Sequence, residues 1–390
     1  MSRIDELIGE FNSRGVEFKA LGEVLNYEQP GKYLVDSVNY DNSFATPVLT
    51  AGQTFVLGYT DETTGIYPAS RDAPVVIFDD FTTAFKWVDF PFKAKSSAMK
   101  MLTPKAGVSL RYVWFAMQTI RYSAQEHARQ WIATYSGFRI AVPPLEVQRE
   151  VVSILDNFTE LEAELEAELE ARRRQYAFYR DQLLTFANAV GVRWVPMGDL
   201  GTLVRGRRFT KSDVVEAGIP SIHYGEIYTS YGTATDHTVS QVRIDLNEQL
   251  RYAMPGDVVI AGVGETVEEI GKAVAWLGDS RVAVHDDCFI FRHGQNPKFV
   301  SYFLQTKAFH GVKAQYVARA KIKRLSAESI AKIPMPVPPL AEQARIVAIL
   351  DNFDTLVNDL SIGLPAELAA RRKQYEYYRD RLLTFKELAA

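Results

Sequence analysis

One long stretch of the chain has apolar residues at the spacing of an amphipathic helix. Between residues 145 and 186, leucine, phenylalanine and tyrosine recur every three or four positions, as in Leu155, Phe158 and Leu161. Residues at this spacing share one face of an α-helix, and the proline pair before the stretch suits a helix start. A continuous helix over these residues would be about 60 Å long, at a rise of about 1.5 Å per residue. The pattern therefore predicts a helix longer than one globular domain contains.

The sequence of this helix occurs a second time near the end of the chain. Three segments return 195 residues later: Val142-Pro-Pro-Leu145 as Val337-Pro-Pro-Leu340, Gln148 as Gln343, and Ile154-Leu-Asp-Asn-Phe158 as Ile349-Leu-Asp-Asn-Phe353. A fourth segment, Tyr176 to Phe186, returns 199 residues later as Tyr375 to Phe385, so the second copy has four extra residues. Gly363 and Pro365 lie in the region of this insertion, and both residue types disfavour helix. We therefore expect the second copy to be broken or kinked there.

The middle of the first helix repeats four residues, in the order Leu161-Glu-Ala-Glu, Leu165-Glu-Ala-Glu and Leu169-Glu-Ala-Arg. Four residues turn a helix by about 400°, so successive leucines drift by about 40° and a partner helix must cross or wrap. Residues 142–190 contain ten acidic and five basic residues, which gives this segment a net charge of −5. Because such a segment repels phosphates, we interpret it as a spacer with its charges in water.

The segments that precede the two helices predict mixed domains with short β-rich runs, such as Pro74 to Phe78 and Asp257 to Ile260. They resemble each other only at their entrances, where Gly15 to Val24 parallels Gly191 to Leu200. The predicted fold class is therefore α+β, with two mixed α/β domains joined by two long, roughly antiparallel coiled-coil helices and internal pseudo-twofold symmetry. We expect the first domain over 1–143, the first helix over 144–190, the second domain over 191–337 and the second helix over 338–390.

Two divergent domains, each followed by a Pro-Pro-Leu helix with Gln three residues on, form a specific pattern. Both helices also end in Gln-Tyr-x-x-Tyr-Arg-Asp-x-Leu-Leu-Thr-Phe. Across essentially its whole length, the chain resembles the specificity subunit of type I restriction-modification systems. Within the domains, Phe92 to Lys100 and Gly206 to Ser212 resemble target-recognition domains of two different subgroups.

The resemblance implies a division of labour. The specificity subunit reads a bipartite DNA site, one domain per half-site, and directs adenine methylation and cleavage by partner subunits. The implied partners are double-stranded DNA, two modification (methyltransferase) subunits, and restriction subunits that carry the ATPase and nuclease activities. The resemblance implies no cofactor and no catalytic residue in this chain. S-adenosylmethionine, ATP and Mg are expected in the partner subunits.

Basic and polar residues gather at three places that suit DNA contact, since cations bind phosphates and Gln can address an adenine edge. The candidate DNA-binding residues are Lys86, Lys93, Lys95, Ser96, Ser97, Lys100, Arg205, Arg207, Arg208, Lys211, Lys313, Gln315, Arg319, Lys321, Lys323 and Arg324. The alternative for each cluster is a solvated surface. We interpret the group around Gly206 as a flexible basic turn. Residues 191–337 contain 18 basic and 15 acidic residues, a net charge of +3, against −4 for the whole chain.

Two acidic pairs allow other chemical interpretations. Asp79-Asp80 indicates a structural turn, with a hydrogen bond to a cytosine amino group as the alternative. His285-Asp-Asp-Cys288 lacks a second Cys or His pair at zinc spacing, so a metal site is disfavoured. Cys288 is the single cysteine, and its place at the start of an apolar run predicts a buried thiol.

Two other classes of function are weaker. A self-contained methyltransferase or nuclease is disfavoured because Gly264 to Ala273 does not match a phosphate loop, and Asn296-Pro-Lys-Phe299 lacks the second proline of the methyltransferase signature. A coiled-coil scaffold without DNA affinity is disfavoured by the two large domains. The charged first residues are unlike a secretory signal, and no window reaches the roughly 18 apolar residues of a membrane span. We therefore expect a cytoplasmic protein with no membrane partner.

Overall fold

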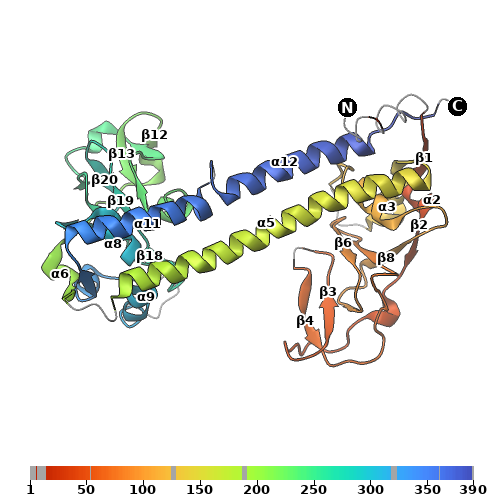
Figure 1. The fold of residues 1–390 in the computed structure, drawn as a ribbon, viewed down its shortest axis with the longest axis horizontal. Helices are drawn as coiled ribbons and strands as arrows, with labels where there is room; N and C mark the ends of the chain where they lie inside the picture. Colours follow the sequence, from red (N-terminus) through yellow and green to blue (C-terminus); the bar gives the residue numbers. More distant parts are fainter. Residues whose placement is uncertain are drawn as a thin grey trace. The chain divides into compact units, whose positions relative to one another are not determined.

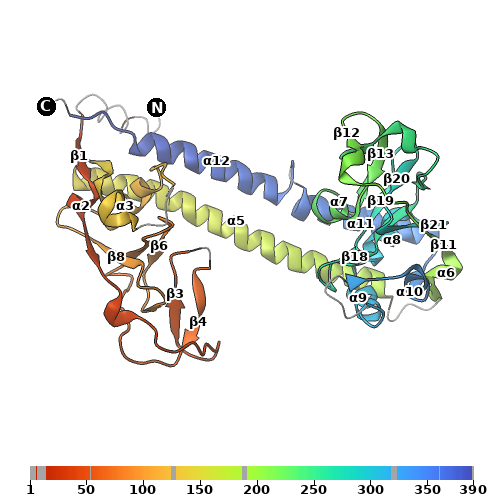
Figure 2. The same ribbon diagram turned by 180° about the vertical axis from the view of Figure 1, so that it is seen from behind.

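The computed structural model describes residues 6, 15–52, 54–123, 129–186, 191–317, 323–359 and 361–388. The chain forms two compact units, Met1–Glu164 with Ala369–Ala390 (unit 1) and Leu165–Leu368 (unit 2). Figures 1 and 2 show the elements of each unit from opposite sides. Both units combine helices with β-sheets, so the predicted α+β class is confirmed.

The described residues of unit 1 form three sheets. Its elements before the first long helix are β1 (Glu17–Ala20), α2 (Leu21–Val24), β2 (Leu25–Glu28), η1 (Gly31–Tyr33), β3 (Thr46–Leu49), β4 (Val56–Thr60), β5 (Val75–Asp79), β6 (Phe85–Val88), β7 (Lys93–Ala94), β8 (Met99–Pro104), α3 (Leu110–Met117), α4 (Gln130–Ala133), η2 (Tyr135–Gly137) and β9 (Arg139–Val142). The central sheet has the order β2-β8-β5-β6 and is antiparallel throughout. A second sheet, β4-β3-β7, includes one parallel pair, β3 with β7, and β1 pairs with β9.

In unit 2, the part of the chain that the structure describes forms four sheets. Its elements before α11 are β10 (Arg193–Pro196), α6 (Met197–Leu200), β11 (Gly201–Arg205), η3 (Lys211–Asp213), β12 (Val214–Val215), β13 (Ile219–Ile222), α7 (Tyr224–Thr229), β14 (Ala234–Thr235), β15 (Ser240–Val242), η4 (Ile244–Leu246), β16 (Tyr252–Ala253), β17 (Val258–Ala261), β18 (Val263–Gly264), β19 (Ala273–Trp276), β20 (Val282–Val284), β21 (Cys288–His293), α8 (Pro297–Phe303), α9 (Lys307–Lys313), β22 (Lys323–Arg324), α10 (Ala327–Ala331) and β23 (Pro334–Val337). The sheets have the orders β11-β21-β17-β19-β14, β12-β15-β13-β20-β16, β10-β23 and β18-β22.

The two units share one strand topology although their sequences diverge after the entrance. Strands β2, β8, β5 and β6 of unit 1 take the places of β11, β21, β17 and β19 in unit 2, with the same antiparallel pairings. The additional sheets also correspond, because β3 pairs in parallel with β7 as β13 does with β20. Sequence comparison found the likeness only at the entrances, so the shared frame extends further than we predicted.

The central strand of each frame is buried on both faces. In β5, Val76 and Phe78 join the core beneath α3, while Val75 and Ile77 face the second sheet. Successive side chains of a strand point to opposite faces, so a fully apolar run is what a sheet covered on both sides requires. Strand β17 has the same fully buried pattern.

The first long helix, α5, runs without interruption over Leu145–Thr185, so this prediction is confirmed. The second copy is divided into α11 (Leu340–Asn358) and α12 (Leu364–Leu383), as the glycine and proline indicated. In the break, the Asp359 carboxylate accepts hydrogen bonds from the backbone N–H groups of Ser361 and Ile362. A Cβ at Gly363 would lie 2.4 Å from the carbonyl oxygen of Thr355. No helix among the described residues is long and apolar enough to span a membrane.

The repeated sequences also make repeated contacts. In unit 1 the ring of Phe158 on α5 stacks on Tyr378 of α12 at 5.5 Å. In unit 2 the first long helix supplies the tyrosine and the second copy supplies the phenylalanine: Tyr179 of α5 stacks on Phe353 of α11 at 5.8 Å. The glutamates at 164, 166, 168 and 170 are exposed, which confirms that these charges of the spacer lie in water.

Candidate DNA interface

Two basic clusters that lie far apart in the sequence of unit 2 meet at one cavity. Arg205 ends β11, and Arg324 lies on β22, which pairs with β18. Both line a cavity of about 450 Å³ together with Arg208 and Lys211. Arg205 and Arg324 keep 54% and 61% of their side chains exposed, so both guanidinium groups remain accessible to a ligand.

An acidic turn, Asp286-Asp287, lies between these arginines and directly before β21. The Arg205 guanidinium lies 3.2 Å from the Asp286 carboxylate and donates to the Asp286 carbonyl at 2.7 Å. The Arg324 guanidinium lies 3.6 Å from the Asp287 carboxylate. Exposed ion pairs of this kind are worth little energetically, so a phosphate can replace the carboxylate. The turn was not among the predicted site residues, since it becomes recognisable only when the arginines are placed beside it.

The basic turn at 205–208 is held by its backbone. The Gly206 N–H donates to the Cys288 carbonyl at 3.0 Å, and the Arg207 N–H donates to the Val284 carbonyl at 2.9 Å. A Cβ at Gly206 would lie 2.2 Å from the His285 carbonyl oxygen, so only glycine permits this approach. These contacts correct our interpretation of a flexible turn, because the backbone is fixed while the side chains of Arg207 and Arg208 are exposed.

His285, Asp286 and Asp287 bring possible metal-ligand atoms within 4.8 Å of one another. Both ring nitrogens of His285 already have partners, the Phe209 carbonyl oxygen at 3.1 Å and the Asp287 N–H at 3.2 Å. Since the two carboxylates also pair with arginines, these contacts favour a structural role for the turn. Cys288 follows the turn and is buried, as predicted; burial raises the pKa of its thiol.

In unit 1 the predicted residues Lys95, Ser96 and Ser97 occupy the place that the acidic turn has in unit 2. The Lys95 N–H donates to the Leu49 carbonyl, and the His285 N–H donates to the Ile222 carbonyl, so each loop leaves its parallel strand in the same way. Each loop then enters the central sheet, through β8 or β21. Lys95 and Ser97 are exposed, and the Lys95 ammonium lies 2.9 Å from the Tyr40 hydroxyl.

The structure argues against three of the predicted DNA contacts, because their ammonium groups are buried and bound within the protein. Lys93 is 3% exposed and pairs with Glu62, whose carboxyl pKa is lowered by that ammonium. Lys100 is fully buried and lies 2.9 Å from the Asp80 carboxylate. Neither side chain can reach a phosphate from these positions.

Lys313 is the third of these buried lysines. Its fully buried ammonium donates to the Ile270 carbonyl at 2.6 Å and to the Glu268 carbonyl at 3.2 Å, and lies 2.7 Å from Nδ1 of His310. Burial lowers the pKa of Lys313 to about 8. The side chain therefore fixes the segment around Glu268 to helix α9.

The other predicted DNA-binding residues differ in how exposed they are. Lys86 is exposed on β6, the edge strand of its sheet, and Gln315 is exposed just after α9. Lys323 is half-buried on β22. Arg319 and Lys321 lie outside the described residues.

The acidic pair Asp79-Asp80 has the structural role that we favoured. The Asp79 carboxylate accepts from the N–H groups of Phe81 and Thr82 and shapes the turn. Asp80 is 1% exposed, and its carboxylate accepts from the Trp131 N–H at 2.8 Å in addition to binding Lys100.

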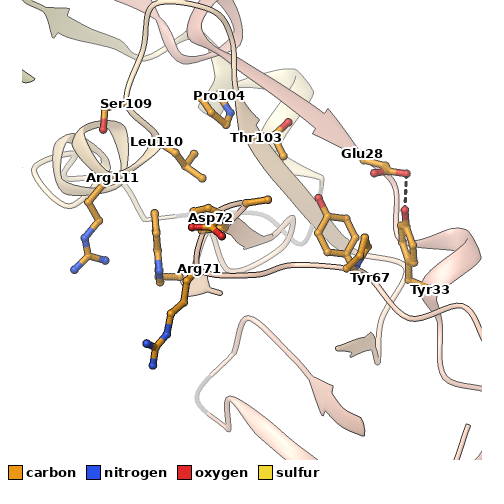
Figure 3. Close-up of a pocket in the computed structure, with 14 residues that line it drawn as sticks. Glu28, Tyr33, Tyr67, Arg71, Asp72, Thr103, Pro104, Ser109, Leu110 and Arg111 are labelled. Atoms are coloured by element: carbon orange, nitrogen blue, oxygen red, sulfur yellow. Dashed lines mark hydrogen bonds between the residues drawn. The ribbon is translucent and has the colours of Figure 1, made fainter. Parts of the chain in front are cut away.

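A separate cavity of about 720 Å³ lies in unit 1. Figure 3 shows Glu28 and Tyr33 at one end of it, joined by a hydrogen bond, and Arg71 and Arg111 at the other end. The described residues that line it include none of the sixteen predicted DNA contacts. Arg111 instead pairs with Asp156 of α5 at 2.7 Å, so this cavity borders a contact between the domain and its helix.

Comparison with solved structures identifies this architecture as that of type I S subunits. The crystal structure of the type I restriction-modification S subunit from M. genitalium matches with a TM-score of 0.54 at 12% identity, over 96% of this chain and 97% of that one. A chain from a study of complex assembly and conformational transition of the type I R-M system matches with a TM-score of 0.60 at 16% identity, over 95% of this chain and 97% of that one.

Sequence comparison identifies the family. The profile described as "Type I restriction modification DNA specificity domain" matches residues 190–370. The specificity subunit of the Escherichia coli type I restriction enzyme EcoR124I/EcoR124II is 38% identical over 391 residues, covering 95% of this chain and 94% of that protein. The chain therefore belongs to the type I restriction-modification specificity subunits, as the repeated motifs indicated.

Proposed function

We propose that this specificity subunit reads a bipartite DNA site, with the first domain (1–143) on one half-site and the second domain (191–337) on the other. The observation that carries the proposal is the shared strand frame, in which loops at equivalent places differ in chemistry. Lys95, Ser96 and Ser97 lie at one such place in unit 1. In unit 2 the equivalent place has Asp286 and Asp287, which pair with Arg205 and Arg324. A common frame with different contact residues is what two readers of different base sequences require.

The proposal assigns the spacer segments 144–190 and 338–390 to holding the two readers apart. Two modification subunits then methylate adenine using S-adenosylmethionine, and restriction subunits cleave the DNA using ATP and Mg. This chain contributes neither cofactors nor catalytic groups. The names of the relatives support this division of labour, since they are specificity subunits of restriction enzymes. The proposed place of action is the cytoplasm.

Within the second domain, Arg205 and Arg324 are the residues that we assign most directly to DNA. Replacing either with Gln should lower the salt dependence of holoenzyme binding by about one phosphate contact, because each neutralised phosphate adds about 0.9 to the slope against log salt. Arg193→Gln is the matched control, since Arg193 is an exposed cation on β10 and does not line the cavity. An equal effect of all three substitutions would mean that charge in general, rather than this cavity, contacts DNA.

The decisive experiment is methylome sequencing of a strain that expresses the complete enzyme, compared with a strain lacking this subunit. A bipartite motif with one methylated adenine in each half-site is expected. Replacing residues 20–141 with the domain of a relative should change the bases of one half-site only. Changes in both half-sites would contradict independent reading by the two domains.

Binding experiments with the purified chain and with the complete complex test the two alternative functions, a self-contained methyltransferase and a scaffold without DNA affinity. If the purified chain alone binds S-adenosylmethionine, a self-contained methyltransferase gains support. If the complete complex binds no DNA, a scaffold gains support. We expect the chain alone to bind DNA weakly, because a net charge of −4 leaves few cations to neutralise phosphates around a duplex.

A further inference from the structure

Two buried glutamines, one in each copy of the repeat, join a recognition domain to the start of its spacer helix. Gln148 of α5 and Gln343 of α11 are both fully buried. The side-chain oxygen of Gln148 accepts a hydrogen bond from the Ser109 N–H at 2.9 Å, and that of Gln343 accepts from the Asn296 N–H at 2.9 Å. The positions of the two partners correspond, because Ser109 is the N-cap of α3 and Asn296 is the N-cap of α8.

The amide nitrogens of both glutamines complete the joint. Nε2 of Gln148 donates to the Pro143 carbonyl and Nε2 of Gln343 to the Pro338 carbonyl, each at 2.8 Å. Each side chain thus connects the chain just before its own helix with the N-terminus of the domain's helix. Inside the protein these polar groups have no water to replace a lost partner, so the joint is costly to open.

A second attachment lies eight residues further along each spacer helix. The Asp156 carboxylate binds the Arg111 guanidinium of α3 at 2.7 Å, and the Asp351 carboxylate binds the Lys298 ammonium of α8 at 2.8 Å. Eight residues correspond to a rise of about 12 Å along a helix. Two attachments at this separation resist both tilting and rolling of the helix against the domain. In Figure 1, α3 lies beside the N-terminal part of α5.

The helices that receive these contacts lead back to the candidate interface. Helix α3 follows β8, which begins after the loop with Lys95, and helix α8 follows β21, which begins after the Asp286-Asp287 turn. We call the loop with Lys95 and the Asp286-Asp287 turn the reading loops. In each domain, one strand and one short helix connect the reading loop to the spacer helix. A small change of angle at the joint is carried to the loop through the helix, the strand and the short connection between them, residues 105–109 in the first domain and 294–296 in the second.

From these contacts we infer that Gln148 and Gln343, assisted by Asp156 and Asp351, are positioning residues that set the accepted gap between the two half-sites. The inference rests on the proposed bipartite reading. The glutamines touch no base; they fix the angle at which each domain leaves its helix. One base pair changes the separation of the half-sites by about 3.4 Å and their rotation by about 35°, so gap selection needs a stiff joint.

The experiment uses the complete enzyme and a plasmid library in which the mapped half-sites are separated by the native gap or by gaps one and two base pairs shorter or longer. The readout is the ratio of methylation at altered gaps to methylation at the native gap. Gln148→Met keeps the side-chain length and removes both hydrogen bonds. This ratio should rise about tenfold for gaps changed by one base pair, the factor that corresponds to one weakened buried contact. Gln343→Met should act in the same way.

A merely structural role would lower methylation at all gaps in proportion and leave the ratio unchanged. The control is Arg149→Gln, because Arg149 is the exposed neighbour of Gln148 on the same helix. Should the methionine variants fail to fold, Asp156→Asn tests the second attachment, since Asp156 is 42% exposed and its loss does not open the core. This variant should also raise the ratio, by a smaller factor.

Unchanged ratios in the folded variants overturn the inference, and so does a change in the bases of a half-site at constant gap. Failure of the proposed function is recognised separately. In that case the wild-type enzyme itself would give no bipartite motif, whereas a bipartite wild-type motif with unchanged variant gaps refutes only the role of the joints.

Discussion

Replacing Lys100 with methionine distinguishes a structural lysine from a DNA contact. The Lys100 ammonium binds the Asp80 carboxylate at 2.9 Å and the Gln29 side-chain oxygen at 3.0 Å. Neither side chain of the ion pair is more than 1% exposed. Methionine matches the length of lysine but leaves the Asp80 charge buried without its cation. Removing one partner of such a pair costs about 3–5 kcal/mol. We expect a decrease of about 3 kcal/mol in the free energy of unfolding of unit 1, because the Trp131 N–H still binds Asp80.

Urea titration of the purified subunit measures this loss, with Lys100→Met and Asp80→Asn combined as the second variant. The double variant should recover most of the stability, since asparagine removes the buried charge and keeps an acceptor for the Trp131 N–H. The salt dependence of DNA binding by the complete enzyme should not change in either variant. Full stability of Lys100→Met together with a salt slope lowered by about 1 would refute the structural interpretation and restore a phosphate contact.

Three further outcomes can be measured. Deleting Leu165–Glu168 shortens α5 by about 6 Å and turns it by about 40°, so the gap in the methylome should shrink by about one base pair, and altered half-sites with an unchanged gap would refute the role of the helix as a ruler. Gly363→Ala should lower the melting temperature, because a Cβ there meets the Thr355 carbonyl oxygen at 2.4 Å; an unchanged melting curve would show that the break can relax. Burial, and secondarily the charge of Lys313, lowers the pKa of His310 to about 4. Between about pH 6.5 and 4, His310 is therefore protonated in the unfolded chain but neutral in the folded chain. Stability should therefore fall as the pH falls through this range, and His310→Gln should flatten the profile; an equally steep profile in that variant would assign the effect to other groups.

The features that the sequence could predict are those carried by local repetition. The spacing of Leu155 and Phe158 predicts the long helix because a helical face depends only on neighbours three and four residues apart. The break near Gly363 could be predicted because glycine weakens a helix and Pro365 has no amide N–H to donate. Because the two copies align in sequence, Phe158 corresponds to Phe353 and Tyr378 to Tyr179. The sequence therefore contains the information that the same two types of ring stack in both units.

The site could be predicted only in part, since its partners are distant in sequence. Lys93 and Lys100 look like surface cations until Glu62 and Asp80 are placed beside them by the sheets. Lys313 is bound by backbone carbonyls, which leave no trace in composition. Conversely, the clusters around Arg205 and Arg324 were predicted separately, and their meeting at one cavity depends on the pairing of β22 with β18.

The buried joints receive the domains through main-chain groups. Gln148 uses the N–H of Ser109 and the carbonyl of Pro143, and Gln343 uses the N–H of Asn296 and the carbonyl of Pro338. Every non-proline residue carries an N–H and every residue a carbonyl, so these four bonds place no demand on the side chains of the domain. A further bond does, because Nε2 of Gln343 also donates to the Gln295 side-chain oxygen at 2.8 Å. An incoming domain with unrelated reading loops could dock on the same helix whenever its last strand and helix follow the same path and its helix carries a cation in the place of Arg111 or Lys298. A lineage could thus acquire a new DNA target by recombination between genes, without first evolving a new way of attaching the reader.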